Sequence, residues 1–307
     1  MPAESLPERV ASTSRAIRLA LAQFAVPTDA SEARARVERA IAAAAAGRAD
    51  LVALPELCLL PYFPVESATE AFDLAEPIPG PASDWLGEIA SGVGVAINTT
   101  LFERIAAGVY ANTSVLVDRE GRLVATYRKA HIPDDPGFGE KYYFTPGDRA
   151  CAVATLDTDA GPLRVGLLVC WDQWYPEAAR LAALQGAELL LYPTAIGWAP
   201  DEAAEHAAQH DAWRTMHRGH AIANAVYVAA ANRVGVERET TFWGGSCVVA
   251  PDGAVLGEMG HADDGVAVVD IDRAAIERQR RFWPFLRDRR IDLYGGLTRR
   301  WLGEPEP

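Results

Sequence analysis

Short apolar runs that end at a proline or a polar residue alternate with stretches of helical spacing along most of this chain. Residues 17–26 form one such run, which stops at Pro27, and residues 30–49 then repeat alanine, valine and isoleucine at helical spacing. Residues 51–54 form the next apolar run and stop at Pro55. Buried strands connected by helices produce this pattern. The alternation therefore predicts an α/β fold with mixed sheets.

The same pattern continues through the rest of the sequence. Residues 93–102, 110–118 and 123–132 are separated by glycine-containing turns, which predicts a meander of three strands. We expect further strands at residues 163–169, 188–192, 227–231, 246–250 and 266–271, and helices at residues 83–91, 176–185 and 206–225. No change of composition or linker divides the chain. We therefore expect one domain over residues 16–307, preceded by a flexible N-terminal extension over residues 1–15.

Charge and cysteine usage restrict the partners. The chain of 307 residues has 42 acidic and 29 basic residues, a net charge of −13, and no basic stripe, so we expect no nucleic-acid partner. No apolar run reaches the roughly 18 to 20 residues of a membrane span, so we expect no membrane partner. The four cysteines lack CxxC spacing and three lie in apolar runs, which is typical of a reducing, cytoplasmic location.

Three polar residues stand at the ends of apolar strands. Glu56 follows the run 51–54, Lys129 lies near the end of the run 123–132, and Cys170 lies at a strand-to-helix joint. Strand ends gather at one edge of such sheets, so these residues can meet in a pocket. A thiolate can attack a carbonyl carbon, a carboxylate can take the thiol proton, and an ammonium can hold the oxyanion. Each residue also has an inert explanation: a buried core cysteine, a solvated turn glutamate and a surface Arg128/Lys129 pair.

The local strings are more specific than the spacing. LPELCLLPYFP, YRKAHIPDDPGFGEKYYFTPGD and GLLVCWDQWYPEAARLAALQGAELLLYPTAIGW resemble the three signature regions of the nitrilase, or carbon–nitrogen hydrolase, superfamily. The resemblance covers nearly the whole chain, and within the superfamily the strings are most similar to those of the N-carbamoylputrescine amidases. It implies that residues 16–307 are a carbon–nitrogen hydrolase domain with a four-layer αββα sandwich.

The resemblance also implies roles for four residues. Glu56 would be the general base, Lys129 the oxyanion stabiliser, Cys170 the nucleophile and Glu140 a second carboxylate that positions Lys129 and substrate. Enzymes of this family need no metal or organic cofactor and are often homo-oligomers, so we expect no cofactor and a homo-oligomer. The chain departs from similar amidases in a shorter segment over residues 236–241, which is expected to change the mouth of the pocket.

Two pairs of histidines have the spacing of zinc ligands on a helix. His206 and His210 are four residues apart, and His217 and His220 are three apart. No glutamate stands where an H-E-x-x-H site needs one, because Ala207 follows His206. We expect no metal site, and a polar helix face or a subunit contact is the better explanation.

The substrate is inferred from charge near the nucleophile. Relatives that hydrolyse N-carbamoyl amino acids place an arginine close after the cysteine, where it can grip a carboxylate. Here no basic residue follows Cys170 until Arg180. Trp171, Asp172 and the pair Asp134/Asp135 could suit an alkyl ammonium, although turn capping explains the pair equally well. We assign the substrate contacts to Tyr62, His131, Trp171, Asp172 and Trp198.

The expected function is cysteine-dependent hydrolysis of a small ureido or amide substrate. An N-carbamoyl amine, with N-carbamoylputrescine first, would give the amine, carbon dioxide and ammonia. Another nitrilase-type amidase, acting on aliphatic or arylalkyl amides or on N-carbamoyl-β-alanine, is the alternative within the class. A non-catalytic oligomeric scaffold is the alternative from another class, but a scaffold has no reason to keep a charged residue at each strand end.

Overall fold

The computed structural model describes residues 16–199 and 205–303. The predicted extension over residues 1–15 lies outside the described residues. In the described ranges the strands form two six-stranded sheets and one three-stranded sheet. The first sheet has the order β15-β1-β2-β3-β4-β5 and contains β1 (Ile17–Gln23), β2 (Leu51–Ala53), β3 (Ala96–Ala106), β4 (Val109–Val117), β5 (Leu123–Arg128) and β15 (Gly265–Ile271).

The second sheet has the order β14-β13-β10-β8-β7-β6. Its strands are β6 (Ala152–Thr158), β7 (Gly161–Leu167), β8 (Leu189–Thr194), β10 (Tyr227–Asn232), β13 (Cys247–Val249) and β14 (Val255–Glu258). The small sheet consists of β9 (Gly197–Trp198), β11 (Val234–Glu237) and β12 (Thr240–Trp243). Strands β3, β4 and β5 pair antiparallel in sequence order, so the predicted meander is confirmed.

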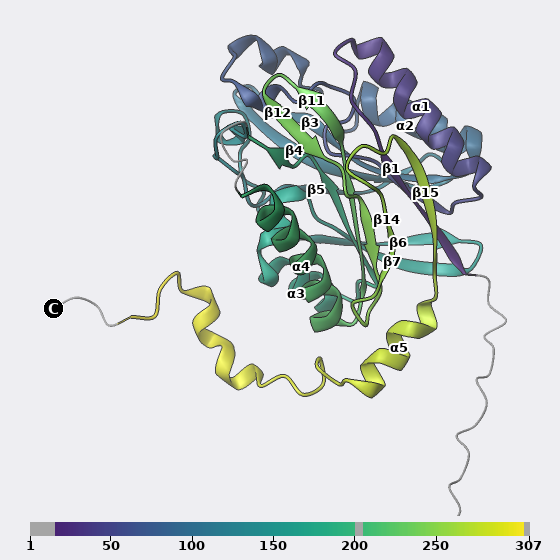
Figure 1. Ribbon diagram of the computed structural model, residues 1–307, viewed down its shortest axis with the longest axis vertical. Coiled ribbons are helices and arrows are strands. Elements are labelled where there is room, and N and C mark those ends of the chain that lie inside the picture. Colours follow the sequence, from purple (N-terminus) through teal and green to yellow (C-terminus); the bar gives the residue numbers. More distant parts are fainter. Residues whose placement is uncertain (1–15, 200–204, 304–307) are drawn as a thin grey trace, which may run out of the picture.

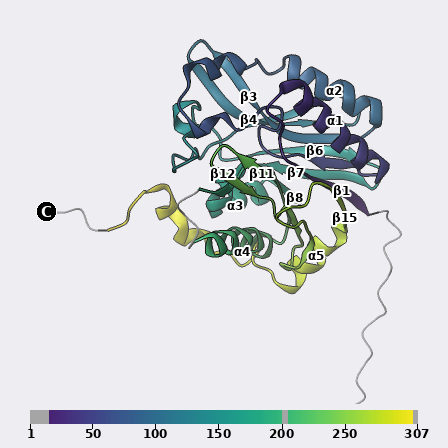
Figure 2. The same cartoon turned by 45° about the horizontal axis from the view of Figure 1, so that its top comes forward.

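Helices cover the outer face of each large sheet (Figures 1 and 2). Helices α1 (Ala30–Ala46) and α2 (Pro81–Val93) pack on the first sheet, and α3 (Pro176–Leu184) and α4 (His206–Asn224) pack on the second. The Asp29 side chain caps the start of α1 by accepting from two backbone N–H groups, those of Ser31 and Glu32. The four-layer αββα sandwich is therefore confirmed.

Strand β1 separates two of the apolar layers of the core. Leu19 and Leu21 point into the apolar layer between the two large sheets, whereas Ala20 and Ala22 point toward α1 and α2. This alternation follows from the two-residue period of a strand. Because both faces of β1 are covered, its sequence reads as one continuous apolar run rather than an alternating one.

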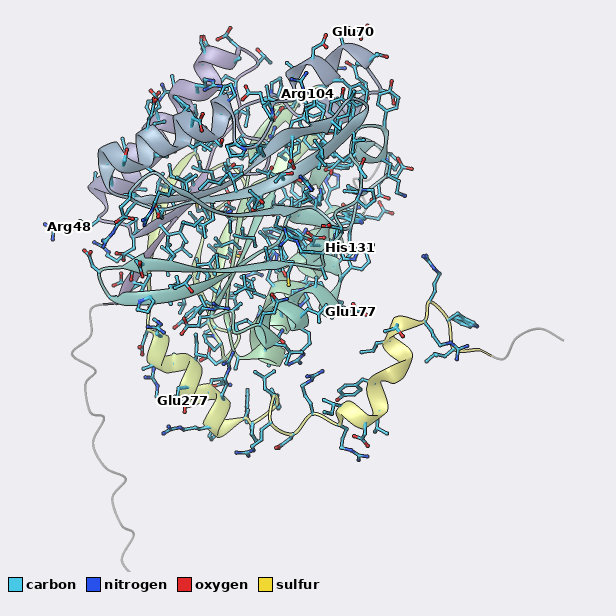
Figure 3. The ribbon with its side chains drawn as sticks, turned by 180° about the vertical axis from the view of Figure 1, so that it is seen from behind. Arg48, Glu70, Arg104, His131, Glu177 and Glu277 are labelled. Carbon is cyan, nitrogen blue, oxygen red and sulfur yellow. The ribbon has the colours of Figure 1, made fainter. Side chains whose placement is uncertain are left out.

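Several elements differ from the expectation. Strand β8 continues through Pro193, which is tolerated because pairing with β7 ends at Leu191 and Pro193 pairs with β10 alone. The segment 236–241 forms the tip of the β11–β12 hairpin, with residues 238–239 as its turn, and helix α5 (Arg273–Phe282) follows the last strand. After α5, residues 283–303, here called the C-terminal arm, leave the body of the molecule (Figures 1 and 3). None of the helices in the described ranges has the length and apolarity to cross a bilayer.

Candidate active site

The three predicted strand-end residues lie together where the two large sheets meet. Glu56 follows β2 and Lys129 follows β5 in the first sheet, and Cys170 follows β7 in the second. The Lys129 Nζ atom lies 2.8 Å from Glu56 Oε1 and 2.7 Å from Glu140 Oε2. All four side chains are buried. The topology thus brings a thiol, an amine and two carboxylates from distant parts of the chain to one place.

Glu56 is held from both sheets. Its Oε1 atom accepts from Asn112 Nδ2 at 2.6 Å as well as from Lys129, and its Oε2 atom accepts from the Ala195 backbone N–H at 2.8 Å. The buried Arg233 guanidinium donates to the Glu56 backbone carbonyl at 2.7 Å. These bonds leave the carboxylate little rotational freedom. A general base needs such a fixed position because it must stay within reach of the proton that it takes.

Cys170 begins a short 3₁₀ turn over Cys170–Trp174, and α3 starts six residues later. Its backbone is left-handed, with φ of 37°, a strained conformation for a residue with a side chain and one that clusters at functional sites. Burial, and then the charge of Glu56, raise the pKa of the Cys170 thiol well above its usual 9.0. The resting nucleophile is therefore a thiol, and it must lose its proton to the neighbouring base as it attacks.

Lys129 stays charged despite complete burial. Burial alone would lower its pKa, but the carboxylates of Glu140 and Glu56 outweigh it and hold the pKa of Lys129 above its usual 10.5. Glu140 also accepts from Tyr62 Oη at 2.7 Å. Burial raises the pKa of Glu140 to about 7, against the opposing effect of Lys129. The site therefore presents a fixed ammonium that can stabilise an oxyanion.

A cavity of about 240 Å³ opens onto Cys170 and Glu140. Four aromatic side chains line it, Phe138, Trp171, Trp174 and Trp243, and the polar Asp135 and Gln209 also line it. Another cavity, of about 280 Å³, lies beside Arg34 and Asp73 and contains none of the four site residues. The cavity at Cys170 is thus the one that matches the chemistry, with room for a small organic substrate.

The predicted substrate contacts fall into two groups. Trp171 lines the cavity, whereas Tyr62, His131, Asp172 and Trp198 are not among its described lining residues. Tyr62 lies behind Glu140, and Trp198 stacks on His206 and donates its indole N–H to the His206 carbonyl at 3.2 Å.

Asp172 is fully buried and holds the protein rather than facing the cavity. It accepts from the Val169 backbone N–H at 3.0 Å, from Tyr127 Oη at 2.9 Å and from the His131 backbone N–H at 3.1 Å. The His131 ring bonds to the same carboxylate at 2.7 Å and stacks on Tyr175 with 3.6 Å between ring centroids. Both residues therefore fix the loops around Cys170.

Sequence reasoning missed Asn112, Arg233, Phe138, Gln209 and Trp243. Asn112 and Arg233 were detectable in principle as polar residues inside or just after apolar runs. The cavity residues on α4 and β12 carried no comparable signal. The histidine pairs do not gather as metal ligands: in residues 16–199 and 205–303, no three His, Cys, Asp or Glu side chains form a group that could hold a metal ion.

Comparison with known proteins agrees with this geometry. Residues 18–281 match the carbon-nitrogen hydrolase family model. The chain is 38% identical over 294 residues to an N-carbamoylputrescine amidase of Solanum lycopersicum, covering 93% of this chain and 96% of that protein. It is 36% identical over 290 residues to a citrullinase of Francisella tularensis, covering 93% of this chain and 99% of that protein.

Solved structures give the same result. The crystal structure of a carbon-nitrogen hydrolase from Helicobacter pylori superposes with a TM-score of 0.89 at 38% identity, covering 94% of this chain and all of that one. An amidase from Nesterenkonia sp., solved with the acetamide moiety of fluoroacetamide covalently added at its active-site cysteine, superposes with a TM-score of 0.73 at 29% identity, covering 95% of this chain and 98% of that one. With its αββα sandwich and its buried cysteine, lysine and two glutamates, the chain belongs to the carbon–nitrogen hydrolase family and is an enzyme that hydrolyses carbon–nitrogen bonds.

Proposed function

We propose that this enzyme hydrolyses N-carbamoyl amines, with N-carbamoylputrescine as its preferred substrate. Cys170 Sγ attacks the ureido carbon while Glu56 takes the thiol proton, and Lys129 stabilises the oxyanion. The bond between the ureido carbon and the terminal nitrogen breaks, Glu56 returns the proton to this nitrogen, and ammonia departs. A carbamoyl group then remains bound to Sγ. Water activated by Glu56 then attacks this thiocarbamate, which frees the thiol and releases a carbamic acid that loses carbon dioxide to give the amine.

The observation that carries the substrate choice is the charge of the cavity wall. None of the described residues that line it is a lysine or an arginine, whereas Asp135 contributes a carboxylate and Trp171 and Trp174 contribute aromatic faces. A substrate that ends in an ammonium gains from carboxylates and aromatic rings, and one that ends in a carboxylate gains from neither. The name of the tomato relative supports the same choice.

A panel of ureido substrates that differ in the charge at the far end tests this proposal. We expect kcat/KM for N-carbamoylputrescine to exceed that for N-carbamoyl-β-alanine by roughly 10³-fold, with butylurea, which lacks the terminal charge, in between. Ammonia release is the readout, and Cys170→Ala is the blank. Faster turnover of the carboxylate-ended substrate would reject the charge argument, and turnover of plain amides alone would favour the general amidase.

Citrulline belongs in the panel for a specific reason. Its end carries both an ammonium and a carboxylate, and a relative that is 36% identical over 290 residues is named a citrullinase. Citrulline is therefore the second candidate. A kcat/KM for citrulline above that for N-carbamoylputrescine would select it.

We further propose that the enzyme is a cytoplasmic homo-oligomer. Its four cysteines are free and buried, which suits a reducing compartment. The C-terminal arm exposes large apolar side chains, among them Ile291 at 72%, Leu293 at 66% and Trp301 at 78%. The arm carries five arginines and two aspartates, whereas the whole chain has a net charge of −13. A basic, apolar arm complements the acidic body of a second copy.

A further inference from the structure

Hydrogen bonds to Gln173 attach the turn that carries the nucleophile to helix α4. The Gln173 Oε1 atom accepts from Trp213 Nε1 at 2.6 Å and from His217 Nε2 at 3.0 Å. The Gln173 backbone carbonyl accepts from His220 Nε2 at 2.7 Å. Residues 213, 217 and 220 share one face of α4, and all three side chains are buried. Three donors of one helix face therefore converge on a residue three positions after Cys170.

The opposite side of the same turn is held by Asp172. Its carboxylate accepts from Val169 at the end of β7 and from Tyr127 on β5. Cys170 lies before these two anchors, and its thiol makes a long hydrogen bond of 3.9 Å to the Ala195 carbonyl. The direction of the Sγ atom is therefore set by the left-handed backbone at Cys170, and this backbone is set by the anchors that follow it.

The chemistry of His217 fits a fixed donor. Burial, with His220 and His210 nearby, lowers the pKa of His217 to about 3, so the ring is neutral at any working pH. A neutral imidazole donates from one nitrogen only. Because the side-chain amide oxygen of Gln173 can only accept, the donating nitrogen of His217 is Nε2. The other nitrogen, Nδ1, lies 3.9 Å from the Cys247 thiol. The ring thus bridges the core of the second sheet to the nucleophile turn.

We propose that Gln173 and His217 are positioning residues for Cys170, which hold the nucleophile turn against α4 in the orientation that attack requires. The same helix also supplies Gln209 and Ala212 to the cavity wall. Helix α4 therefore sets the distance between the substrate cavity and the sulfur. Because the role concerns the cysteine and not the substituent of the substrate, it does not depend on which carbon–nitrogen substrate the enzyme prefers.

The test compares a variant that loses the donor with one that keeps it. In His217→Leu the bond to Gln173 is lost, whereas in His217→Gln an amide N–H reaches about as far as Nε2. Cys247→Ala is the matched control, because it loosens the same cluster from the far side of His217 without touching the bond to Gln173. The measurements are kcat and KM for the best substrate of the panel, and the second-order rate of Cys170 alkylation by iodoacetamide, all well below each variant's unfolding temperature.

We expect kcat of H217L to fall about 10- to 100-fold with KM within about threefold, since a displacement near 1 Å can cost two orders of magnitude. Alkylation of Cys170 should slow in parallel, while H217Q and C247A stay within about threefold of the parent in both measurements. The inference is overturned if H217L retains kcat within twofold, if H217Q falls as far as H217L, or if C247A falls with them. Where H217L does not fold, H217N replaces it, because the shorter asparagine does not reach Gln173. Loss of ureido turnover in the parent with these alkylation differences intact would reject the proposed substrate and leave this inference standing.

Discussion

Replacing Glu140 by glutamine is expected to move activity and stability in opposite directions. The carboxylate lies 2.7 Å from Lys129 Nζ and 2.7 Å from Tyr62 Oη. A glutamine can direct its oxygen to Lys129 and its amide N–H₂ to the Tyr62 hydroxyl, which then accepts instead of donating. The shape of the site is kept, and the change is confined to one negative charge beside the ammonium that stabilises the oxyanion.

The expected effect on stability follows from the pKa of Glu140. Because this pKa rises from its usual 4.5 to about 7, the folded chain binds more protons than the unfolded chain between these pH values. The free energy of unfolding therefore falls as the pH rises through this window, by about 3 kcal/mol in total. The E140Q variant is neutral at every pH and does not have this loss. At pH 8 it should be more stable than the parent by up to about 3 kcal/mol, and below pH 4.5 the two should be equal.

The expected effect on activity has the opposite sign. Removing the charge weakens the hold on Lys129, and loss of one oxyanion-stabilising contact typically costs about 10²- to 10³-fold in kcat. In the parent, kcat/KM should rise with pH through the neutral range as Glu140 ionises, and this acidic limb should be missing or lie at lower pH in E140Q. Ammonia-release kinetics and thermal unfolding at pH 5 and pH 8 measure both effects. A variant that loses activity but is also less stable at pH 8 would refute the reasoning, because Glu140 would then be a structural ion-pair partner first.

The remaining predictions concern the nucleophile, the base, metal dependence and the arm. Cys170→Ala should abolish turnover while thermal unfolding changes little, and iodoacetamide should label Cys170 before the other three thiols, because its sulfur borders the cavity; full activity in this variant would end the assignment. Glu56→Gln should lower kcat by roughly 10²- to 10⁴-fold, whereas a loss below tenfold would point to another base. Exhaustive EDTA treatment should leave kcat unchanged, and a loss that zinc restores would contradict the metal-free chemistry. Truncation after residue 282 should lower the oligomer mass measured by light scattering, and an unchanged mass would show that the arm is not the contact.

The strand ends were the part of the site that sequence could predict. Glu56 and Cys170 each follow an apolar run with a sharp end, so their placement needed only the rule that strand ends share an edge. Lys129 was expected within a strand and lies just after β5, which ends at Arg128. The difference is small because the Lys129 backbone N–H still donates to the Asn112 carbonyl at 2.9 Å, as if the ladder continued.

The contacts between elements could not be predicted in the same way. Asn112 reaches Glu56 because of the register between β4 and its neighbours. Residues 111–117 of β4 are buried on both faces, so the sequence has no alternation that shows which face meets the site. Strand β6 was missed because it lies at a sheet edge and is only partly buried, so its sequence has no continuous apolar run. The cavity side chains of α4 and β12 depend on how a helix and a hairpin pack, which composition does not encode.

The division of the site between two sheets has a consequence for how the enzyme matures. The base and the lysine belong to one sheet and the nucleophile to the other, and the Ala195 N–H from the second sheet is bonded to Glu56 of the first. Either sheet alone holds only part of the chemistry. Circular dichroism during refolding reports the ladders, whereas ammonia release reports their docking. A chain whose two sheets have not docked cannot hold the base, the lysine and the nucleophile together, so hydrolysis requires the contact between the sheets.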